Sequence, residues 1–177
     1  MADGWKVVHM KIVITAPFAA QQVEELKGQH EVLFSPQDDS TPLRSEEQLH
    51  SLLAEERAEI FITESDRVTA QVLEGLDDLK LLCVCRTGLN NIDIPACTDH
   101  GVALVNAPGR NAAAVADMVM ALFIDMSRFL FEGEKLLRSG QWDEGIYYRL
   151  RGHELYGNTV ATIGFGALPQ ELAKRIF

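Results

Sequence analysis

Cysteine is rare in this sequence. Three cysteines, Cys83, Cys85 and Cys97, occur among 177 residues, without a Cys-x-x-Cys pair or a Cys/His cluster. Structural zinc sites use four such ligands at short, regular spacings, so the sequence predicts no metal site. We interpret the three as reduced thiols that pack like small hydrophobic side chains, as is usual in a cytoplasmic protein.

Lysine and arginine are also few. The chain has 16 Lys and Arg residues against 26 Asp and Glu residues, a formal net charge of −10. Proteins that bind nucleic acid or anionic membranes present a basic face, and no cluster of Lys or Arg supplies one here. We therefore expect no nucleic-acid partner and no membrane partner. We interpret the acidic exterior as an aid to solubility, with recruitment of a basic partner as the alternative.

Long uninterrupted hydrophobic runs are missing as well. Residues 1–10 include charged side chains and lack the apolar core of a signal peptide. The longest apolar-rich stretch, residues 115–131, is interrupted by Asp117, Asp125 and Arg128. It is therefore not expected to span a membrane. The sequence predicts an untargeted, cytoplasmic protein.

What the chain does contain is a regular alternation of apolar runs and helix-like segments. Hydrophobic residues make up 47% of the sequence and charged residues 24%, which is ordinary for a protein with a buried core. Strands are expected at residues 11–15, 31–34, 59–63, 80–85 and 102–105. Helices are expected at residues 20–27, from Ser45 onward, at residues 69–75 and from Pro95 to Gly101.

This alternation predicts a fold class. Strands that are continuously apolar and separated by helices indicate a parallel sheet covered on both faces. We predict an α/β fold in which residues 1–105 form a flavodoxin-like, doubly wound parallel sheet. Ser45 and Gln48 have the spacing of a capping box and mark the start of one of its helices.

The pattern changes after residue 105. The turn residues Asn106-Ala107-Pro108-Gly109 interrupt the alternation, and Asn111 is a candidate N-cap for a long helix over residues 112–131. Apolar residues cover more than one narrow stripe of that helix, so more than its own domain is expected to bury it. Two interpretations stay open: a core helix between two domains, and part of a homodimer interface.

The C-terminal residues have the layout of a dinucleotide-binding fingerprint. An expected strand at residues 159–163 leads into Gly164-Phe165-Gly166-Ala167-Leu168, and a helix follows up to Phe177. In such a turn the glycines let the backbone approach a pyrophosphate, and the helix N-terminus faces its charge. We predict that residues 106–177 begin a Rossmann nucleotide-binding domain. Pro169 stands where the third glycine is usual, which places close helix–strand packing in question.

Several motifs are spaced along the chain between residues 85 and 166. They are Cys85-Arg86-Thr87-Gly88-Leu89-Asn90-Asn91-Ile92-Asp93, Val105-Asn106-Ala107-Pro108-Gly109-Arg110-Asn111, Gly140-Gln141-Trp142, Glu154-Leu155-Tyr156-Gly157-Asn158-Thr159-Val160 and Ile163-Gly164-Phe165-Gly166. Together they resemble the NAD-dependent D-isomer-specific 2-hydroxyacid dehydrogenases, and within them the D-3-phosphoglycerate dehydrogenase-like branch. The resemblance implies hydride transfer between NAD and a small 2-hydroxy or 2-oxo acid.

The resemblance also implies roles for particular residues. Arg86, Thr87 and Gly88 would offer backbone amides to the substrate carboxylate, as a loop rich in exposed N–H groups can. Val115 would lie near the nicotinamide, and residues 164–168 would hold the cofactor. The long helix at residues 112–131 would contribute to a homodimer. Without a ligand, Gly88 would serve only as a turn with positive φ, and Val115 only as a core residue.

Two further expectations follow from the family pattern. Its catalytic Arg, Glu and His would fall beyond Phe177, so none of the five histidines is assigned to catalysis and this chain alone is expected to be inactive. Phosphoglycerate dehydrogenases usually carry an arginine at about the position of Glu64, and a carboxylate there would repel a substrate phosphate. The alternative function is a non-catalytic, dinucleotide-responsive or dimerising protein of the corepressor type.

Overall fold

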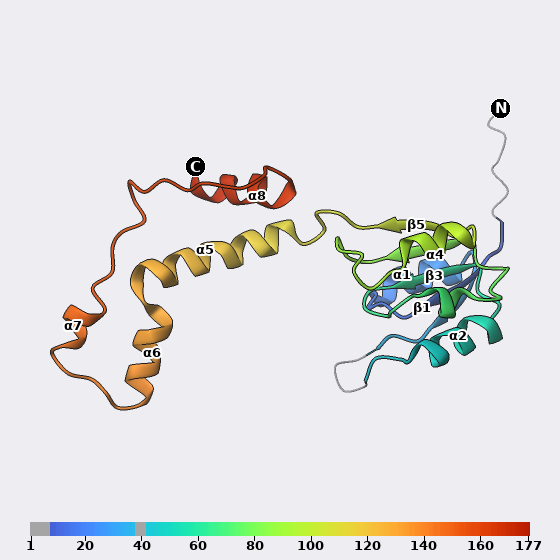
Figure 1. The fold of residues 1–177 in the computed structure, drawn as a ribbon, viewed down its shortest axis with the longest axis horizontal. Coiled ribbons are helices and arrows are strands. Elements are labelled where there is room, and N and C mark those ends of the chain that lie inside the picture. The colour runs from blue at the N-terminus through green and yellow to red at the C-terminus, as the bar shows by residue number, and fades with distance from the viewer. Residues whose placement is uncertain (1–7, 38–41) are drawn as a thin grey trace. The chain divides into compact units, whose positions relative to one another are not determined.

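Five parallel strands form a sheet in the order β2-β1-β3-β4-β5 (Figure 1). The strands are β1 Lys11–Ile14, β2 Glu31–Phe34, β3 Ile60–Thr63, β4 Leu81–Val84 and β5 Ala103–Asn106. This computed structural model describes residues 8–37 and 42–177. The order is that of flavodoxin-like sheets, so the predicted doubly wound α/β fold is confirmed.

Short helices connect successive strands. They are α1 Ala20–Lys27, α2 Glu46–Glu55, α3 Ala70–Leu73 and α4 Ile94–Asp99. The predicted capping box is confirmed, because the Ser45 hydroxyl accepts from the Gln48 N–H and the Gln48 side chain accepts from the Ser45 N–H. The amide of Gly28 at the end of α1 donates to Glu24 O, where the helix was expected to end.

Two apolar clusters cover the two faces of the sheet. Alternate strand residues point to opposite faces, so Phe61 joins the larger cluster with α2, α3 and α4, while Ile62 joins the smaller one. Burial on both faces explains why the central strands β1 and β3 read as continuous apolar runs. Cys83 and Cys85 pack against the same, smaller cluster, as their spacing predicts. Burial, with a smaller contribution from Cys85, raises the pKa of the Cys83 thiol, which therefore stays protonated at neutral pH.

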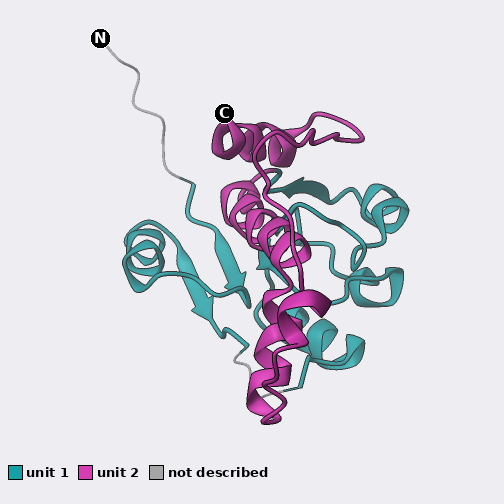
Figure 2. Ribbon diagram, turned by 90° about the vertical axis from the view of Figure 1, so that its left-hand side faces the viewer, with its two compact units in different colours: residues 1–108 teal, residues 109–177 magenta. Residues whose placement is uncertain are grey.

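The chain divides into two compact units, residues 1–108 and residues 109–177 (Figure 2). The second unit contains α5 Ala112–Arg128, α6 Leu130–Arg138, α7 Ile146–Arg149 and α8 Ala167–Ile176. Helices α5 and α8 pack against each other. No described helix, in either unit, combines the length and the apolarity needed to cross a membrane.

The predicted single helix over residues 112–131 is wrong in its extent. Phe129 adopts a left-handed conformation with φ 57°, which ends α5 at Arg128 before α6 begins. The Asp125 carboxylate accepts from the Phe131 N–H at 2.7 Å and so caps the new helix start. Asn111 is the residue before α5, but its side chain makes no cap hydrogen bond.

The predicted strand at residues 159–163 is also wrong. The segment has no strand assignment, and Ile163 is fully exposed. A strand is defined by hydrogen bonds to a neighbouring strand, and the described residues of the second unit contain no strand to pair with. An apolar run without a partner therefore remains an extended segment.

Candidate functional site

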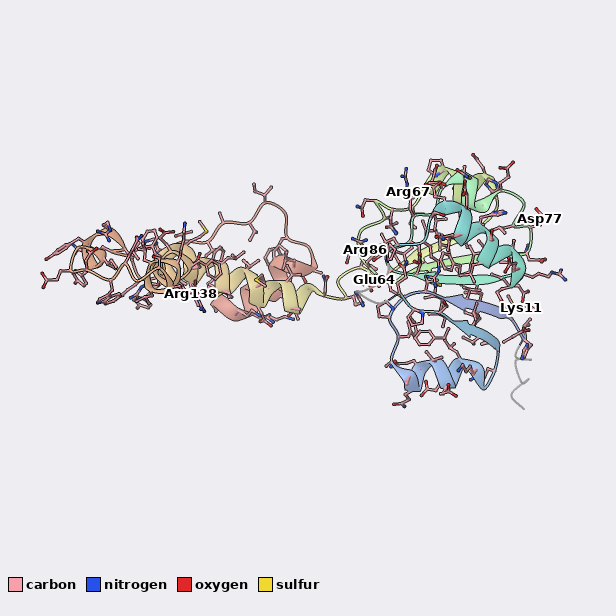
Figure 3. All side chains as sticks on the ribbon, turned by 90° about the horizontal axis from the view of Figure 1, so that it is seen from below. Lys11, Glu64, Arg67, Asp77, Arg86 and Arg138 are labelled. Atoms are coloured by element: carbon pink, nitrogen blue, oxygen red, sulfur yellow. The ribbon has the colours of Figure 1, made fainter. Side chains whose placement is uncertain are left out.

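The candidate site lies at the carboxyl edge of the sheet. Strands β3 and β4 are parallel, with Thr63 opposite Val84, so the residues that follow each strand emerge at one edge. Figure 3 shows Glu64 and Arg86 at this end of the first unit and Lys11 at the other end. Ligands of open α/β sheets bind beyond the carboxyl ends of the strands, which makes this edge the place to look.

We define the anion loop as residues 86–90, the segment that follows β4. Three of its carbonyl groups accept hydrogen bonds from the protein. Arg86 O accepts from Ala107 N–H at 3.2 Å, and Thr87 O accepts from the Asn106 side chain at 2.8 Å. Leu89 O accepts from the Ile92 N–H at 3.0 Å. These bonds turn the acceptors of the loop toward β5 and toward the residues that follow the loop.

Three amide groups of the same loop lack a hydrogen-bond partner among the described residues. Within the described part of the chain, the N–H groups of Gly88, Leu89 and Asn90 have no acceptor. Gly88 and Asn90 are exposed. A loop with three successive free N–H groups suits a carboxylate, because successive N–H groups form an anion-binding concavity.

The backbone conformation at Gly88 does not require a glycine. Its φ is not among the positive values of the chain, so the alternative of a positive-φ turn is wrong. A Cβ built on it would lie 3.6 Å from the Asn90 side-chain oxygen, an ordinary contact. The absence of a side chain instead leaves the neighbouring amides open to a ligand.

A buried polar cluster beneath the loop was not anticipated from the sequence. The Asp66 carboxylate is 1% exposed, and its Oδ2 accepts from the hydroxyls of Thr15 at 2.5 Å and Thr63 at 2.6 Å. The Asn91 side chain donates to Asp66 O at 2.7 Å. The available signal was the placement of small polar residues directly after β1 and β3, since the ends of neighbouring parallel strands meet at one edge.

The glycine turn of the second unit forms the start of a helix. Gly164 has φ 85°, a value that only glycine adopts readily, and Gly166 is the N-cap residue of α8. Ala167 and Leu168 are the first two helical residues, whose N–H groups have no partner within the helix. A Cβ on Gly166 would meet no atom within 4 Å, so space is open there. The helical half of the predicted strand-to-helix corner is present, while its strand half is not.

Pro169 and Val115 both lie in first turns of helices. Pro169 is the third residue of α8, where its missing N–H removes no helical hydrogen bond. Val115 is half-buried in the first turn of α5. A Cβ on Gly109, which has φ 76°, would lie 3.2 Å from the Ala167 Cβ, so the start of α8 lies directly beside the residues that precede α5.

Arg175 fixes the pairing of α5 and α8. Its guanidinium donates to the Asp117 carboxylate at 2.5 Å and to Ala113 O at 3.0 Å. The hydrogen bond to Asp117 raises the pKa of Arg175 further, so the guanidinium stays charged at all physiological pH values. Across residues 8–37 and 42–177, no three His, Cys, Asp or Glu side chains are grouped so as to hold a metal ion.

Comparison with known proteins identifies relatives for almost the whole chain. It is 32% identical over 167 residues to the D-3-phosphoglycerate dehydrogenase of Methanocaldococcus jannaschii, covering 94% of this chain and 30% of that protein. It is 30% identical over 167 residues to the glyoxylate reductase of Thermofilum pendens, covering 94% of this chain and 48% of that protein. The chain thus spans half or less of the length of these relatives.

Solved structures share the fold. The TT0316 protein of Thermus thermophilus superimposes with a TM-score of 0.76 at 26% identity, over 94% of this chain and 52% of that one. The NAD-dependent formate dehydrogenase of Staphylococcus aureus, solved with NAD, gives a TM-score of 0.72 at 23% identity, over 94% of this chain and 53% of that one. The second likeness shows the fold alone.

A family model decides the assignment. The model for the catalytic domain of D-isomer specific 2-hydroxyacid dehydrogenases matches residues 12–171, which include the sheet except for Lys11, the anion loop and the glycine turn. On this match, and on relatives that are at least 30% identical, the chain belongs to the D-isomer specific 2-hydroxyacid dehydrogenase family.

Proposed function

We propose that this chain carries the carboxylate-anchoring part of a dehydrogenase that transfers hydride between NAD(H) and a small 2-hydroxy or 2-oxo acid. In this proposal residues 1–105 form the substrate domain and residues 106–177 begin the nucleotide-binding domain. The observation that carries it is the row of unpartnered amides at Gly88, Leu89 and Asn90 within the described part of the chain. These donors match the one group that all 2-hydroxy and 2-oxo acids share, the carboxylate.

The loop is suited to bind and orient the acid. The carbonyls of Arg86 and Thr87 are held by Ala107 and Asn106, so the peptide group that carries the Gly88 N–H keeps its direction without a ligand and little has to be ordered on binding. In the proposal Arg86, Thr87 and Gly88 surround the carboxylate, and the Arg86 guanidinium adds a positive charge at the same edge. The Thr87 hydroxyl donates to Ala107 O at 3.3 Å, which assigns it to holding the loop.

The glycine turn is suited to hold the cofactor. The open space at Gly166 and the free helix N-terminus at Ala167 and Leu168 fit a diphosphate, which a helix N-terminus attracts. Gly164 and Phe165 shape the approach, and Val115 is proposed to lie near the nicotinamide. When bound, the cofactor would accept the hydride as NAD+ or donate it as NADH. The protein residues orient the acid and the diphosphate.

Binding of a small 2-oxo acid to the loop can be measured directly. We expect glyoxylate to shift the amide NMR signals of Gly88, Leu89 and Asn90 saturably. Gly88→Ala should leave the stability unchanged, since the backbone is unstrained, but should weaken binding about tenfold, or ~1.4 kcal/mol, by crowding the amides. Gly28→Ala is the matched control, because Gly28 has φ −66° and ends α1. Equal affinities for the two variants would contradict the assignment.

The reaction itself is tested on the protein at its full encoded length. We expect NADH oxidation with glyoxylate, hydroxypyruvate or pyruvate. Turnover of phosphohydroxypyruvate should be slower, because Glu64 lies at the same edge and unit charges 4 Å apart repel by about 4 kcal/mol at an effective dielectric of ~20. Glu64→Gln should reduce the difference in turnover rate between phosphohydroxypyruvate and the other three acids. Binding of NADH without turnover of any of these acids would instead support the corepressor-like alternative.

We also propose that the chain forms a homodimer through residues 112–131. The described part of α5 leaves large apolar side chains exposed, among them Met118 at 60% and Met126 at 71%. Exposed apolar patches of this kind mark interaction surfaces. Light scattering after gel filtration should give a dimer, and Met118→Glu should give a monomer. Leu43→Glu, at an exposed apolar position of the first unit, should leave the dimer intact; a monomeric unmodified chain would contradict this proposal.

A further inference from the structure

A buried carboxylate stands where the strand order reverses. The chain passes from β1 outward to β2 and then returns to β3 on the other side of β1, so β1 and β3 flank the switch point. Asp66 bridges the two strand ends through Thr15 and Thr63, and its other oxygen, Oδ1, is buried without a hydrogen-bond partner among the described residues. Burying such a group is costly, so the arrangement calls for a compensating role.

The side chain of Asp66 holds a turn in place. The Asp66 N–H donates to the Thr63 hydroxyl at 3.2 Å, while that hydroxyl donates to the Asp66 carboxylate. These reciprocal bonds define the chain path over residues 63–66. As a result the backbone oxygen of Asp66 has a set position, and it is this oxygen that accepts from the Asn91 side chain.

The same segment supports the chain just after the anion loop. Val68 N–H donates to Asn91 O at 2.9 Å, and Asp93 N–H donates to Val68 O at 2.8 Å, which forms an isolated parallel bridge between Val68 and Ile92. Residues 66–68 therefore hold residues 91–93 in place through hydrogen bonds. Asn91 is bound to residues 66–68 through both its side chain and its carbonyl oxygen.

Both ends of the anion loop consequently rest on one turn. Before the loop, Cys85 N–H donates to Thr63 O at 2.8 Å. After the loop, Asn91 is bound to Asp66 and Val68. Any shift of the turn that contains Asp66 would move both ends and would change the direction of the free amides between them.

We propose that Asp66 and Asn91 are positioning residues for the anion loop. The buried Asp66 carboxylate holds the turn at residues 63–66. The Asn91 side chain ties the end of the anion loop to that turn and thereby sets the direction of the amides of Gly88, Leu89 and Asn90. The ligand concerned is a small carboxylate such as a 2-oxo acid. This inference rests on the proposed function of the loop, but the mechanical coupling can be tested apart from it.

The test compares Asn91→Ala with the matched control Gln29→Ala. Gln29 is an exposed residue before β2, outside the anion loop, and its side chain makes no hydrogen bond among the described residues. We expect Asn91→Ala to weaken glyoxylate binding about tenfold and to speed amide exchange at Val68 and Asp93. Amides of the central strands, such as that of Phe61, should keep their protection. Gln29→Ala should change none of these quantities.

The variant Asn91→Asp distinguishes the effect of the lost hydrogen bond on binding from the effect of a changed side-chain shape. It is isosteric but places an oxygen against the Asp66 carbonyl, so it should weaken binding at least as much as Asn91→Ala. Wild-type affinity in Asn91→Asp, or unchanged affinity and exchange in Asn91→Ala, would overturn the proposal. Asp66→Asn keeps one acceptor oxygen for the two threonine hydroxyls and should bind more tightly than Asp66→Ala. If Asp66→Ala does not fold, the Asn91 variants still decide.

The two proposals fail in distinguishable ways. If the unmodified chain shows no saturable glyoxylate binding, the proposed function of the loop fails. The exchange measurements at Val68 and Asp93 then still report whether Asn91 holds the segment. If glyoxylate binds but the Asn91 variants match the wild type in both readouts, only the positioning role is lost.

Discussion

Replacing Phe61 with alanine is expected to lower the free energy of unfolding of the first unit by about 3–5 kcal/mol. Phe61 lies in β3 with no exposed surface, and it belongs to the larger apolar cluster together with Leu49, Leu53 and Leu82. Truncation removes the transfer free energy of the ring and leaves a cavity that short, paired strands cannot close. Domains of this kind are stable by only about 5–15 kcal/mol, so most of that stability would be lost.

Denaturant unfolding followed by the NMR signals of the first unit measures this effect. Phe131→Ala is the matched control, because it deletes the same ring at a position that is 68% exposed. That variant should change the stability of the first unit by less than about 0.5 kcal/mol. Similar losses for the two variants would contradict the assignment of Phe61 to the core.

Gly152→Ala is expected to displace the segment that follows α7 from the end of α5. A Cβ at this position would lie 2.2 Å from Ser127 O and 3.0 Å from the Cα of Arg128, and both are backbone atoms that cannot rotate away. The hydrogen bond from His153 N–H to Ser127 O, at 2.9 Å, would be lost with the contact. Overpacking of this kind costs about 1–3 kcal/mol.

Limited proteolysis and thermal unfolding test this prediction. In Gly152→Ala we expect faster cleavage around residues 150–158 and a lower melting temperature of the second unit. Gly133→Ala is the control: its Cβ would lie 3.6 Å from the Leu150 side chain, and its place inside α6 favours alanine by up to about 1 kcal/mol. Unchanged proteolysis of Gly152→Ala would show that the segment is not held at Ser127.

The candidate site was only partly predictable from the sequence. The motif around Arg86 indicated the loop through its resemblance to the family, and the motif follows directly after an apolar run. The sequence did not show which backbone groups of the loop are free, since that depends on the hydrogen bonds that Asn106, at the end of β5, and the following Ala107 make to the loop. Asp66 was missed for the same reason, because its partners Thr15 and Asn91 are far from it along the chain.

The errors have a common cause. Residues 159–163 have the apolar character of a strand, but a strand exists only through hydrogen bonds to another segment, and local character cannot supply one. The helix at residues 112–131 ends early because Phe129 adopts a left-handed conformation, and no local residue signal of that kind, such as glycine, marks the position. The domain roles and the cofactor contacts of residues 164–168 stay predictions.

The sequence by itself determined the elements that depend on near neighbours: the five apolar strands, the capping box at Ser45, the end of α1 at Gly28 and the glycine turn before α8. Periodicity and capping act over a few residues, so they can be read directly. Only the tertiary structure decided which amides of the anion loop face outward and that Asp66 lies beneath it. Those features arise because parallel strands distant in sequence end at one edge, where each polar group either finds a partner or stays free for a ligand.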